Sequence, residues 1–236
     1  MSKDIYIFKR IEKKYRISLT DKENLLSEIS DKLIPDSHGK SRIFSLYLDT
    51  PDYRLIRASI EAKTYKEKLR LRCYGIPNDD SKVFFEIKKK FKGVVYKRRV
   101  AMTLTDAKNY IYNGRNPEDS QIMREIDYAM KFYNHPAPSM LITYDREAYY
   151  LKDAQYVRIT FDSNIKYQLG ELFYENGSGK QILSDDKCIL EIKTDGAMPL
   201  WLSHALDKYE ILPSSFSKYG TAYREMLTNV PEPILV

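Results

Sequence analysis

The sequence predicts an α+β fold, an eight-stranded antiparallel β-barrel that forms a tunnel with a charged interior and is flanked by helices. Several stretches alternate charged and apolar residues with a period of two, which is typical of strands with one ionic and one apolar face. Most of these strands should be joined as hairpins. The first and last strands are far apart in the sequence, yet both have a charged face, and closure of the sheet would bring them together.

Strands are predicted from this alternation and from the turn residues between them, at residues 5–18, 44–49, 67–75, 82–91, 94–102, 140–151, 156–166 and 187–194. The first strand has Glu12 and Lys14 on one face. Pro77-Asn78-Asp79-Asp80 is typical of a turn, so the strands on either side of it should form a hairpin. Gly93 marks the turn into the next strand.

Helices are predicted where apolar residues recur at helical spacing, near residues 20–33, 105–113, 122–133, 198–210 and 217–228. The first helix would begin at a capping box formed by Thr20 and Glu23. Asn113-Gly114 would end the second helix. Residues 35–40 are predicted as a loop, and residues 58–66 fit either a short helix or a turn.

The charged face has two interpretations. It could line the inside of a barrel, or it could be the solvated face of an open antiparallel sheet whose apolar face packs on helices. A face that is only solvated would mix Ser, Thr, Gln and both signs of charge, whereas these faces have Arg, Lys and isolated Glu. Because like charges that face each other across a sheet destabilise it, the pattern favours a tunnel that binds an anion.

The composition indicates one soluble domain that covers residues 1–236. Its 39 Lys and Arg outnumber its 33 Asp and Glu and give a net charge of +6, which favours phosphate, nucleic acid or an acidic membrane as partner. Cys73 and Cys188 have no metal-ligand spacing, the N-terminus has no apolar signal core, and no run is long enough to span a membrane. We therefore expect a cytoplasmic protein with no membrane segment in this chain.

Short motifs in a fixed order resemble those of the VTC domain, from about residue 8 to residue 220. They are R-I-E-K-K-Y (10–15), Y-L-D-T-P (47–51), K-L-R-L-R (68–72), F-E-I-K (85–88), Y-K-R-R (96–99), Y-D-R (144–146), V-R-I-T-F-D (157–162), L-E-I-K (190–193) and F-S-K-Y-G (216–220). The VTC domain is the polyphosphate polymerase domain of the vacuolar transporter chaperone complex, in the triphosphate tunnel metalloenzyme, or CYTH-like, superfamily. The resemblance implies an eight-stranded tunnel lined with Lys, Arg and Glu.

The resemblance also implies which residues would act on the substrate. The basic residues that would bind its phosphates in catalysis are Lys14, Arg70, Arg72, Lys88, Lys97, Arg99, Arg146, Arg158 and Lys218. Lys193 is added because it lies two residues after Glu191 on the same face. Arg binds phosphate oxygens through a rigid two-pronged fork, whereas Lys acts as a mobile point charge. No cofactor-binding residue is expected beyond these triphosphate contacts and a metal site.

The metal site would be built on Glu191, with Glu12 and Glu86 as further candidates on their own strands. The cofactor would be Mn²⁺ or Mg²⁺, because one or two carboxylates can hold such an ion together with substrate phosphates. Asp162 fits either this site or a turn at the end of a strand.

One departure from the superfamily pattern bears on function. Related hydrolases begin with a Glu-x-Glu-x-Lys strand, but here Arg10 stands at the first carboxylate position. This favours a metal-dependent phosphotransferase that moves the γ-phosphoryl group of a nucleoside triphosphate to phosphate or a polyphosphate chain. The alternatives are a tripolyphosphatase or nucleoside triphosphatase, and a non-catalytic binder of polyphosphate or RNA. For the phosphotransferase we expect no nucleic acid partner, and protein partners stay open.

Overall fold

The computed structural model describes residues 11–62, 64–92, 94–170 and 179–228. Its strands are β1 (Ile11–Ser18), β2 (Leu33–Asp49), β3 (Tyr65–Tyr74), β4 (Lys82–Phe91), β5 (Val94–Thr103), β6 (Ala137–Leu151), β7 (Arg158–Leu169), β8 (Lys180–Gln181) and β9 (Lys187–Thr194). The helices are α1 (Leu19–Ile29), the 3₁₀ turn η1 (Ser30–Lys32), α2 (Arg54–Glu61), α3 (Leu104–Asn113), α4 (Gln121–Phe132), α5 (Leu200–Lys208) and α6 (Lys218–Thr228).

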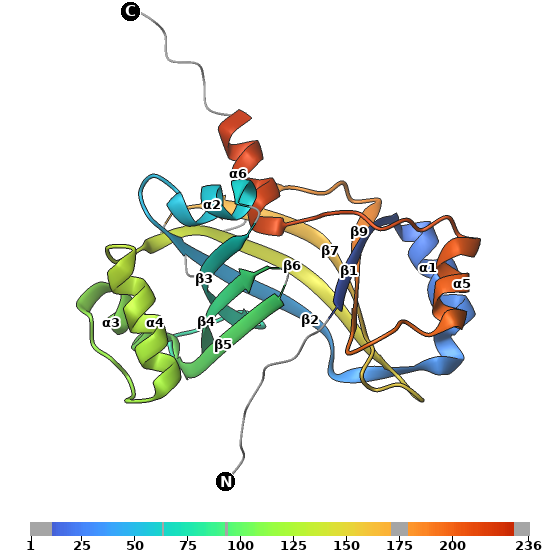
Figure 1. Cartoon of the computed structure of the whole chain (residues 1–236), viewed down its shortest axis with the longest axis horizontal. Helices are drawn as coiled ribbons and strands as arrows, with labels where there is room; N and C mark the ends of the chain where they lie inside the picture. Colours follow the sequence, from blue (N-terminus) through green and yellow to red (C-terminus); the bar gives the residue numbers. More distant parts are fainter. Residues whose placement is uncertain (1–10, 63, 93, 171–178, 229–236) are drawn as a thin grey trace, which may run out of the picture.

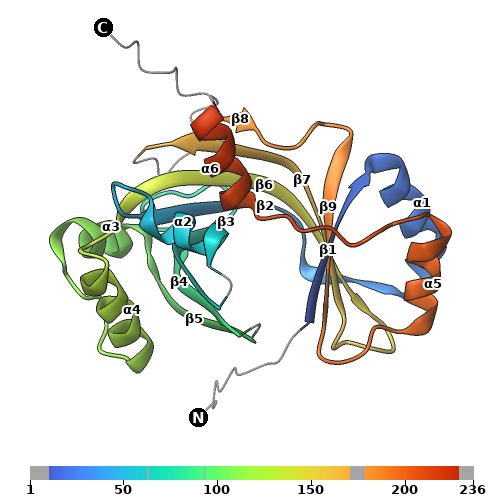
Figure 2. The ribbon, with the colours of Figure 1, turned by 45° about the horizontal axis from the view of Figure 1, so that its top comes forward.

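All strands belong to one nine-stranded sheet, with the order β1-β9-β7-β6-β2-β3-β4-β5 and β8 paired beside β7. Every pairing in it is antiparallel. The long strands β2, β6 and β7 form the middle of the sheet and curve strongly. As a result, strands β3, β4 and β5 lie toward one end of the molecule, and strands β1 and β9 lie toward the other (Figures 1 and 2). The predicted α+β fold with an antiparallel sheet and flanking helices is confirmed.

Closure into an eight-stranded barrel is not formed within the described part of the chain. The order of the sheet ends at β1 and β5, and no backbone pairing joins these two strands among the described residues. The two sides are linked by side chains instead, since the Glu12 carboxylate of β1 lies 3.7 Å from Lys88 Nζ of β4. Arg10 and the predicted strand residues 5–10 lie outside the described residues.

The two faces of the curved sheet differ in what covers them. On one face, α3 and α4 pack at one end and α1 and α5 at the other (Figure 1), over buried apolar side chains such as Leu69, Phe85 and Leu190. On the other face, α2 and α6 pack over Ile142 and Tyr144 of β6. The charged side chains of the strands share this second face, so the apolar positions of the period-two pattern are covered by helices, as the sequence predicts.

Asp49 links the two helices of the charged face. Its buried carboxylate accepts hydrogen bonds from the backbone N–H of Leu55 (2.9 Å) and Ile56 (3.0 Å), and so caps the start of α2. The same carboxylate accepts the hydroxyl of Tyr219 in α6 at 2.8 Å. The Tyr219 ring stacks on Tyr47 of β2, with ring centroids 4.3 Å apart. These contacts fix α2 and α6 against each other and against the sheet.

Several local predictions need correction. The capping box of α1 is formed by Ser18 and Asp21, because the Ser18 hydroxyl accepts the N–H of Asp21 at 3.0 Å, and not by Thr20 and Glu23. The predicted loop at 35–40 lies inside β2, where the pairing with β6 shifts register between Pro35 and Lys40. Of the two readings left open for 58–66, the helix is found, but it begins earlier, at Arg54.

The predicted hairpin on either side of Pro77 is confirmed as β3 and β4. Gly114 ends α3 in the left-handed conformation (φ 67°), as expected for a glycine after the last helical turn. In the described ranges, no helix combines the length and the apolar character that a bilayer span requires.

Candidate functional site

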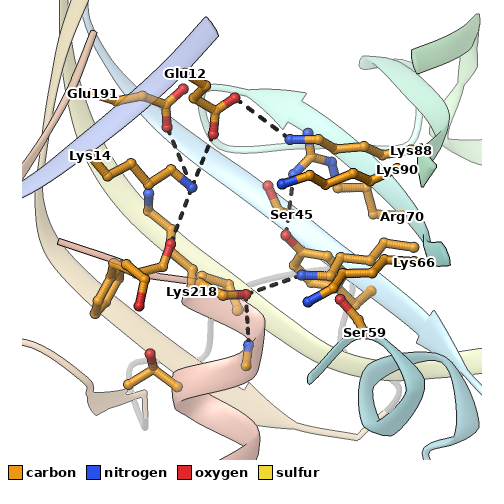
Figure 3. Close-up of a pocket in the computed structure, with 18 of the residues that line it drawn as sticks. Glu12, Lys14, Ser45, Ser59, Lys66, Arg70, Lys88, Lys90, Glu191 and Lys218 are labelled. Carbon is orange, nitrogen blue, oxygen red and sulfur yellow. Dashed lines mark hydrogen bonds and ion pairs between the residues drawn. The ribbon is translucent and has the colours of Figure 1, made fainter. Parts of the chain in front are cut away.

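The charged face of the sheet encloses a pocket of about 510 Å³ (Figure 3). Strands β1, β2, β3, β4, β5, β6 and β9 and helices α2 and α6 contribute to its walls. Its charged lining residues are Glu12, Lys14, Lys66, Lys68, Arg70, Arg72, Lys88, Lys90, Arg146, Glu191, Lys193, Lys218 and Arg224. Only two of these residues are acidic, so the pocket has a large excess of positive charge.

Strand alternation explains why so many basic side chains meet here. On β3, Lys66, Lys68, Arg70 and Arg72 are two residues apart and all line the pocket. The residues between them point to the other face, where they are buried. A period of two along a strand therefore produces a continuous basic row along one wall.

The acidic part of the pocket is built by β1 and β9. Lys14 Nζ lies 3.1 Å from the Glu12 carboxylate and 3.8 Å from that of Glu191, and it also donates to the carbonyl oxygen of Phe216 at 3.1 Å (Figure 3). Lys193 forms a second ion pair with Glu191. The two carboxylates are thus close together and share one ammonium group.

Both carboxylates are held in the charged form. Burial disfavours ionisation of Glu191, but Lys193, Lys14 and Arg146 outweigh it and hold its pKa well below the usual range. Burial and the neighbouring Glu191 charge likewise oppose ionisation of Glu12, yet nearby lysines leave its pKa lowered. Two adjacent ionised carboxylates suit a hard divalent cation whose remaining ligands are phosphate oxygens and water. No cluster of three or more His, Cys, Asp or Glu with metal-binding geometry occurs among the described residues.

Arg72 is a buried guanidinium that forms no direct ion pair among the described residues, although its charge helps to lower the pKa of the Glu86 carboxyl. It is 8% exposed, and its Nη2 donates to the hydroxyl of Tyr144 at 3.1 Å. Its Nε, like the hydroxyl of Ser45 beside it in the sheet register, is buried and has no hydrogen-bond partner in this part of the chain. A buried guanidinium without a direct ion pair and an orphan hydroxyl in one pocket are costly, and an anionic ligand would satisfy both.

Arg146 and Lys218 are held by one buried carboxylate. Asp162, which is 0% exposed, accepts Arg146 Nε at 2.6 Å and Nη2 at 2.8 Å, and it accepts Lys218 Nζ at 2.5 Å. Burial opposes ionisation of Asp162, but Lys218 and Arg146 lower its pKa to about 2. Asp162 lies inside β7, not in a turn at the end of a strand, and it does not line the pocket. In place of the two predicted alternatives, metal ligand and strand-end turn, the structure gives it the role of counter-ion to Arg146 and Lys218.

Glu86 and Lys97 do not line the pocket, although both share the parity of pocket residues. The Glu86 carboxylate is 1% exposed and accepts Arg70 Nε at 2.8 Å, and it lies 2.6 Å from Lys97 Nζ. Glu86 therefore orients Arg70 and, unlike Glu12 and Glu191, does not line the pocket.

Arg99 and Arg158 also lie outside the pocket lining. Arg99 is exposed on β5, the edge strand, with its guanidinium 4.7 Å from the ring centroid of Phe84. Arg158, at the start of β7, is paired with the buried Asp36 at 2.5 Å. The other predicted site residues, Lys14, Arg70, Arg72, Lys88, Arg146, Glu191, Lys193, Lys218 and Glu12, are brought together in the pocket.

The predicted site omits several residues that line the pocket. Lys66, Lys68 and Lys90 share a face with predicted residues of β3 and β4, so an extension of the period-two rule would have found them. Tyr47 and Tyr144 also line the pocket, but they are uncharged and so do not belong to the pattern of charged residues that was used to predict the site. Burial alone would raise the pKa of Tyr47, but the cations Arg70, Lys68 and Arg72 lower it to about 8.

A family profile described as the VTC domain matches residues 9–227. Among solved structures of similar fold is a candidate adenylate cyclase from Bacillus halodurans, with 12% identity, a TM-score of 0.54, and coverage of 89% of this chain and 95% of that chain. Another is a candidate adenylyl cyclase from Hippeastrum, described as having a dominant triphosphatase activity, with 16% identity, a TM-score of 0.54, and coverage of 92% and 96%. At these identities the likeness shows a common fold. No curated protein matches the sequence.

Proposed function

The chain belongs to the VTC domain family, within the CYTH-like triphosphate tunnel superfamily, and on this premise we propose that it is a polyphosphate polymerase-like enzyme. It would transfer the γ-phosphoryl group of a nucleoside triphosphate to phosphate or to a growing polyphosphate chain. The observation that best supports this proposal is the buried Arg72, which forms no direct ion pair among the described residues, in a pocket with a large excess of basic side chains. Such a pocket fits a ligand with several closely spaced negative charges.

The phosphate contacts would come from the opposing walls of the pocket. Arg70, Arg72 and Lys88 on β3 and β4 face Arg146 on β6 and Lys218 on α6, and all five line the pocket. Glu86 and Asp162 keep the guanidinium groups of Arg70 and Arg146 in fixed orientations. Side chains that are already oriented stabilise the charge of the transition state without rearrangement during the reaction.

The transfer itself needs little covalent chemistry from the protein. An anionic oxygen of the acceptor phosphate forms a bond to the γ-phosphorus, while the bond from that phosphorus to the β,γ-bridging oxygen breaks. The nucleoside diphosphate leaves with the bridging oxygen and the electron pair, and the acceptor gains one phosphate. Because the acceptor oxygen is already charged, no general base has to remove a proton. Positioning and charge neutralisation by the basic side chains are the contributions expected of the protein.

A divalent cation would be held by Glu12 and Glu191, since these carboxylates are adjacent and ionised. When bound, Mn²⁺ or Mg²⁺ would neutralise phosphate charge as a Lewis acid. Lys14 and Lys193, which pair with these carboxylates, would keep them oriented.

Hydrolysis is the second candidate function. It is favoured by the similarity in fold to the Hippeastrum protein described as having a dominant triphosphatase activity. In this case water would take the place of the acceptor phosphate in the same pocket.

One experiment separates the candidates. The purified protein is incubated with ATP and Mn²⁺, and the products are separated on a gel and assayed for orthophosphate. A ladder of polyphosphate chains supports the polymerase. A hydrolase is identified if orthophosphate is released without the formation of chains, and if its release from tripolyphosphate is faster than any chain synthesis. Binding without turnover that survives Glu191→Ala identifies a non-catalytic binder.

Replacing Arg72 with Ala should weaken the binding of tripolyphosphate, measured by calorimetry in EDTA. The loss should be about ten- to a hundredfold, because a charge-assisted hydrogen bond to a buried Arg contributes roughly 1.5–3 kcal/mol. The matched control is Arg98→Ala on β5, whose Nε lies 3.5 Å from the Glu125 carboxylate and which does not line the pocket. The control should retain its affinity. If Arg72→Ala unfolds the protein while Arg98→Ala does not, the ionic face is structural.

Binding of tripolyphosphate near pH 8 should be accompanied by proton uptake. Burial lowers the pKa of Lys68 to about 8, and the nearby cations Lys88 and Lys14 add to this effect. A fraction of the protein molecules therefore has a neutral Lys68 near pH 8 in the free state. A bound anion would raise the pKa of Lys68, so that these molecules take up a proton from solvent. Calorimetry in buffers with different ionisation enthalpies measures the uptake. Lys68→Arg, which stays charged, should reduce it, and an unchanged uptake in that variant would refute the assignment.

A further inference from the structure

The wall formed by β3 and β4 becomes more basic toward one end. Four pairs of residues that lie directly opposite each other on β3 and β4 include pocket residues. In order along the wall they are Arg72 with Phe84, Arg70 with Glu86, Lys68 with Lys88, and Lys66 with Lys90. Glu86 neutralises the second pair, but the third and fourth pairs consist of lysines directly opposite each other. Such pairs destabilise a sheet unless a negative charge lies between or above them.

The lysines of the fourth pair have no counter-ion in the structure. The side chains of Lys66 and Lys90 line the pocket but form no ion pair or hydrogen bond with any other residue of the described ranges. Figure 3 shows both side chains reaching toward the interior of the pocket, Lys90 beside Lys88 and Lys66 nearer to Ser59. Lys14, in contrast, is paired with Glu12, on the other side of the pocket. The fourth pair is thus the part of the wall with the most uncompensated charge.

The basic row is longer than a triphosphate. Lys66 and Arg72 are six residues apart on β3, which corresponds to about 20 Å at ~3.3 Å per residue. A triphosphate has three phosphorus atoms joined through two shared oxygens, and it is shorter than this row. If Arg70, Arg72 and Lys88 bind the triphosphate, as the proposed function has it, Lys66 and Lys90 form the next pair of the wall outward from these contacts.

We propose that Lys66 and Lys90 form a subsite for the phosphates of an inorganic polyphosphate chain that lie beyond the first three. This inference rests on the proposed function for the identity of the polymer. Lysine suits such a subsite because a compact charge on a flexible stem imposes no fixed geometry, so successive phosphates can occupy it in turn. The row on β3 then divides into inner arginines that fix the reacting phosphates and outer lysines that hold the rest of the chain.

The test compares two ligands in EDTA, where phosphoryl transfer does not consume them. Affinities for tripolyphosphate and for size-fractionated long-chain polyphosphate are measured for the wild-type protein and for the double variant Lys66→Ala/Lys90→Ala. The matched control is Lys13→Ala/Lys89→Ala, which also removes two charges. Lys13 and Lys89 alternate with pocket residues on β1 and β4 and do not line the pocket.

The subsite variant should bind the long chain about tenfold or more weakly, with a smaller dependence on salt, and should bind tripolyphosphate within about twofold of wild type. The control should bind both ligands almost as the wild type does. An equal loss for both ligands, or an equal loss of long-chain affinity in the control, would overturn the inference. So would unchanged long-chain affinity in the subsite variant. If the protein hydrolyses ATP without making chains, the proposed polymerase function is wrong. The difference in affinity between long-chain polyphosphate and tripolyphosphate still tests whether Lys66 and Lys90 form the subsite.

Discussion

Glutamine in place of Glu191 should lower the rate of metal-dependent phosphoryl transfer by roughly a hundredfold or more. Glu191 is 6% exposed, it is ionised because of the surrounding cations, and it lies with Glu12 around Lys14. Glutamine keeps the shape of the side chain but removes the charge that a divalent cation needs. Affinity for tripolyphosphate in EDTA should stay the same or rise, because one source of repulsion for the phosphates is gone.

Two further measurements make the Glu191 result specific. Mn²⁺ binding in the presence of a non-hydrolysable triphosphate, followed by electron paramagnetic resonance, should weaken in the same variant. Glu147→Gln provides the control, since Glu147 pairs with Lys22 at 2.7 Å and does not line the pocket. Full metal-dependent turnover in Glu191→Gln would show that the metal is held elsewhere.

The part of the site that the sequence could predict depends on strand parity. Arg70, Arg72 and Lys88 lie in the pocket because alternate residues of a strand share one face. Parity cannot tell how far along a face the pocket extends. Lys97 has the same parity, but β5 is the last strand of the sheet, and Lys97 turns to the buried Glu86 instead of the pocket. That outcome depends on sheet order and curvature, which arise from contacts between distant segments.

For the fold, as for the site, local features could be predicted from the sequence and long-range ones could not. Turn residues and periodicity located the hairpin of β3 and β4, because both signals are local. The irregular segment of β2 between Pro35 and Lys40 has the composition of a loop, yet pairing with β6 resumes on both sides of it. The lack of backbone pairing between β1 and β5 among the described residues likewise could not be predicted, since strand pairing at an edge is decided by the whole sheet.

Neutralising Asp162 should have the largest effect on stability. Asp162→Asn leaves Arg146 and Lys218 without their shared carboxylate, in a region where Asp162 itself is 0% exposed. Removing one partner from a buried ion pair costs roughly 3–5 kcal/mol, because the remaining charge stays desolvated. The free energy of unfolding, measured by urea denaturation, should fall by about this amount with an unchanged slope. The control Asp145→Asn breaks a more solvated, half-buried pair with Arg42 (2.9 Å) and should cost less, about 1 kcal/mol.

The dependence on pH tests the same assignment independently. The pKa of Asp162 is lowered from 3.8 to about 2 in the folded protein, so the unfolded chain binds more protons between these values. The stabilisation from the Asp162 carboxylate is therefore complete above about pH 4 and is lost as the pH falls through 2. The difference in unfolding free energy between wild type and Asp162→Asn should shrink over this window, and this change is measured against wild type at each pH. A difference for Asp162→Asn that stays constant down to pH 2 would mean that the charge of Asp162 is not what stabilises Arg146 and Lys218.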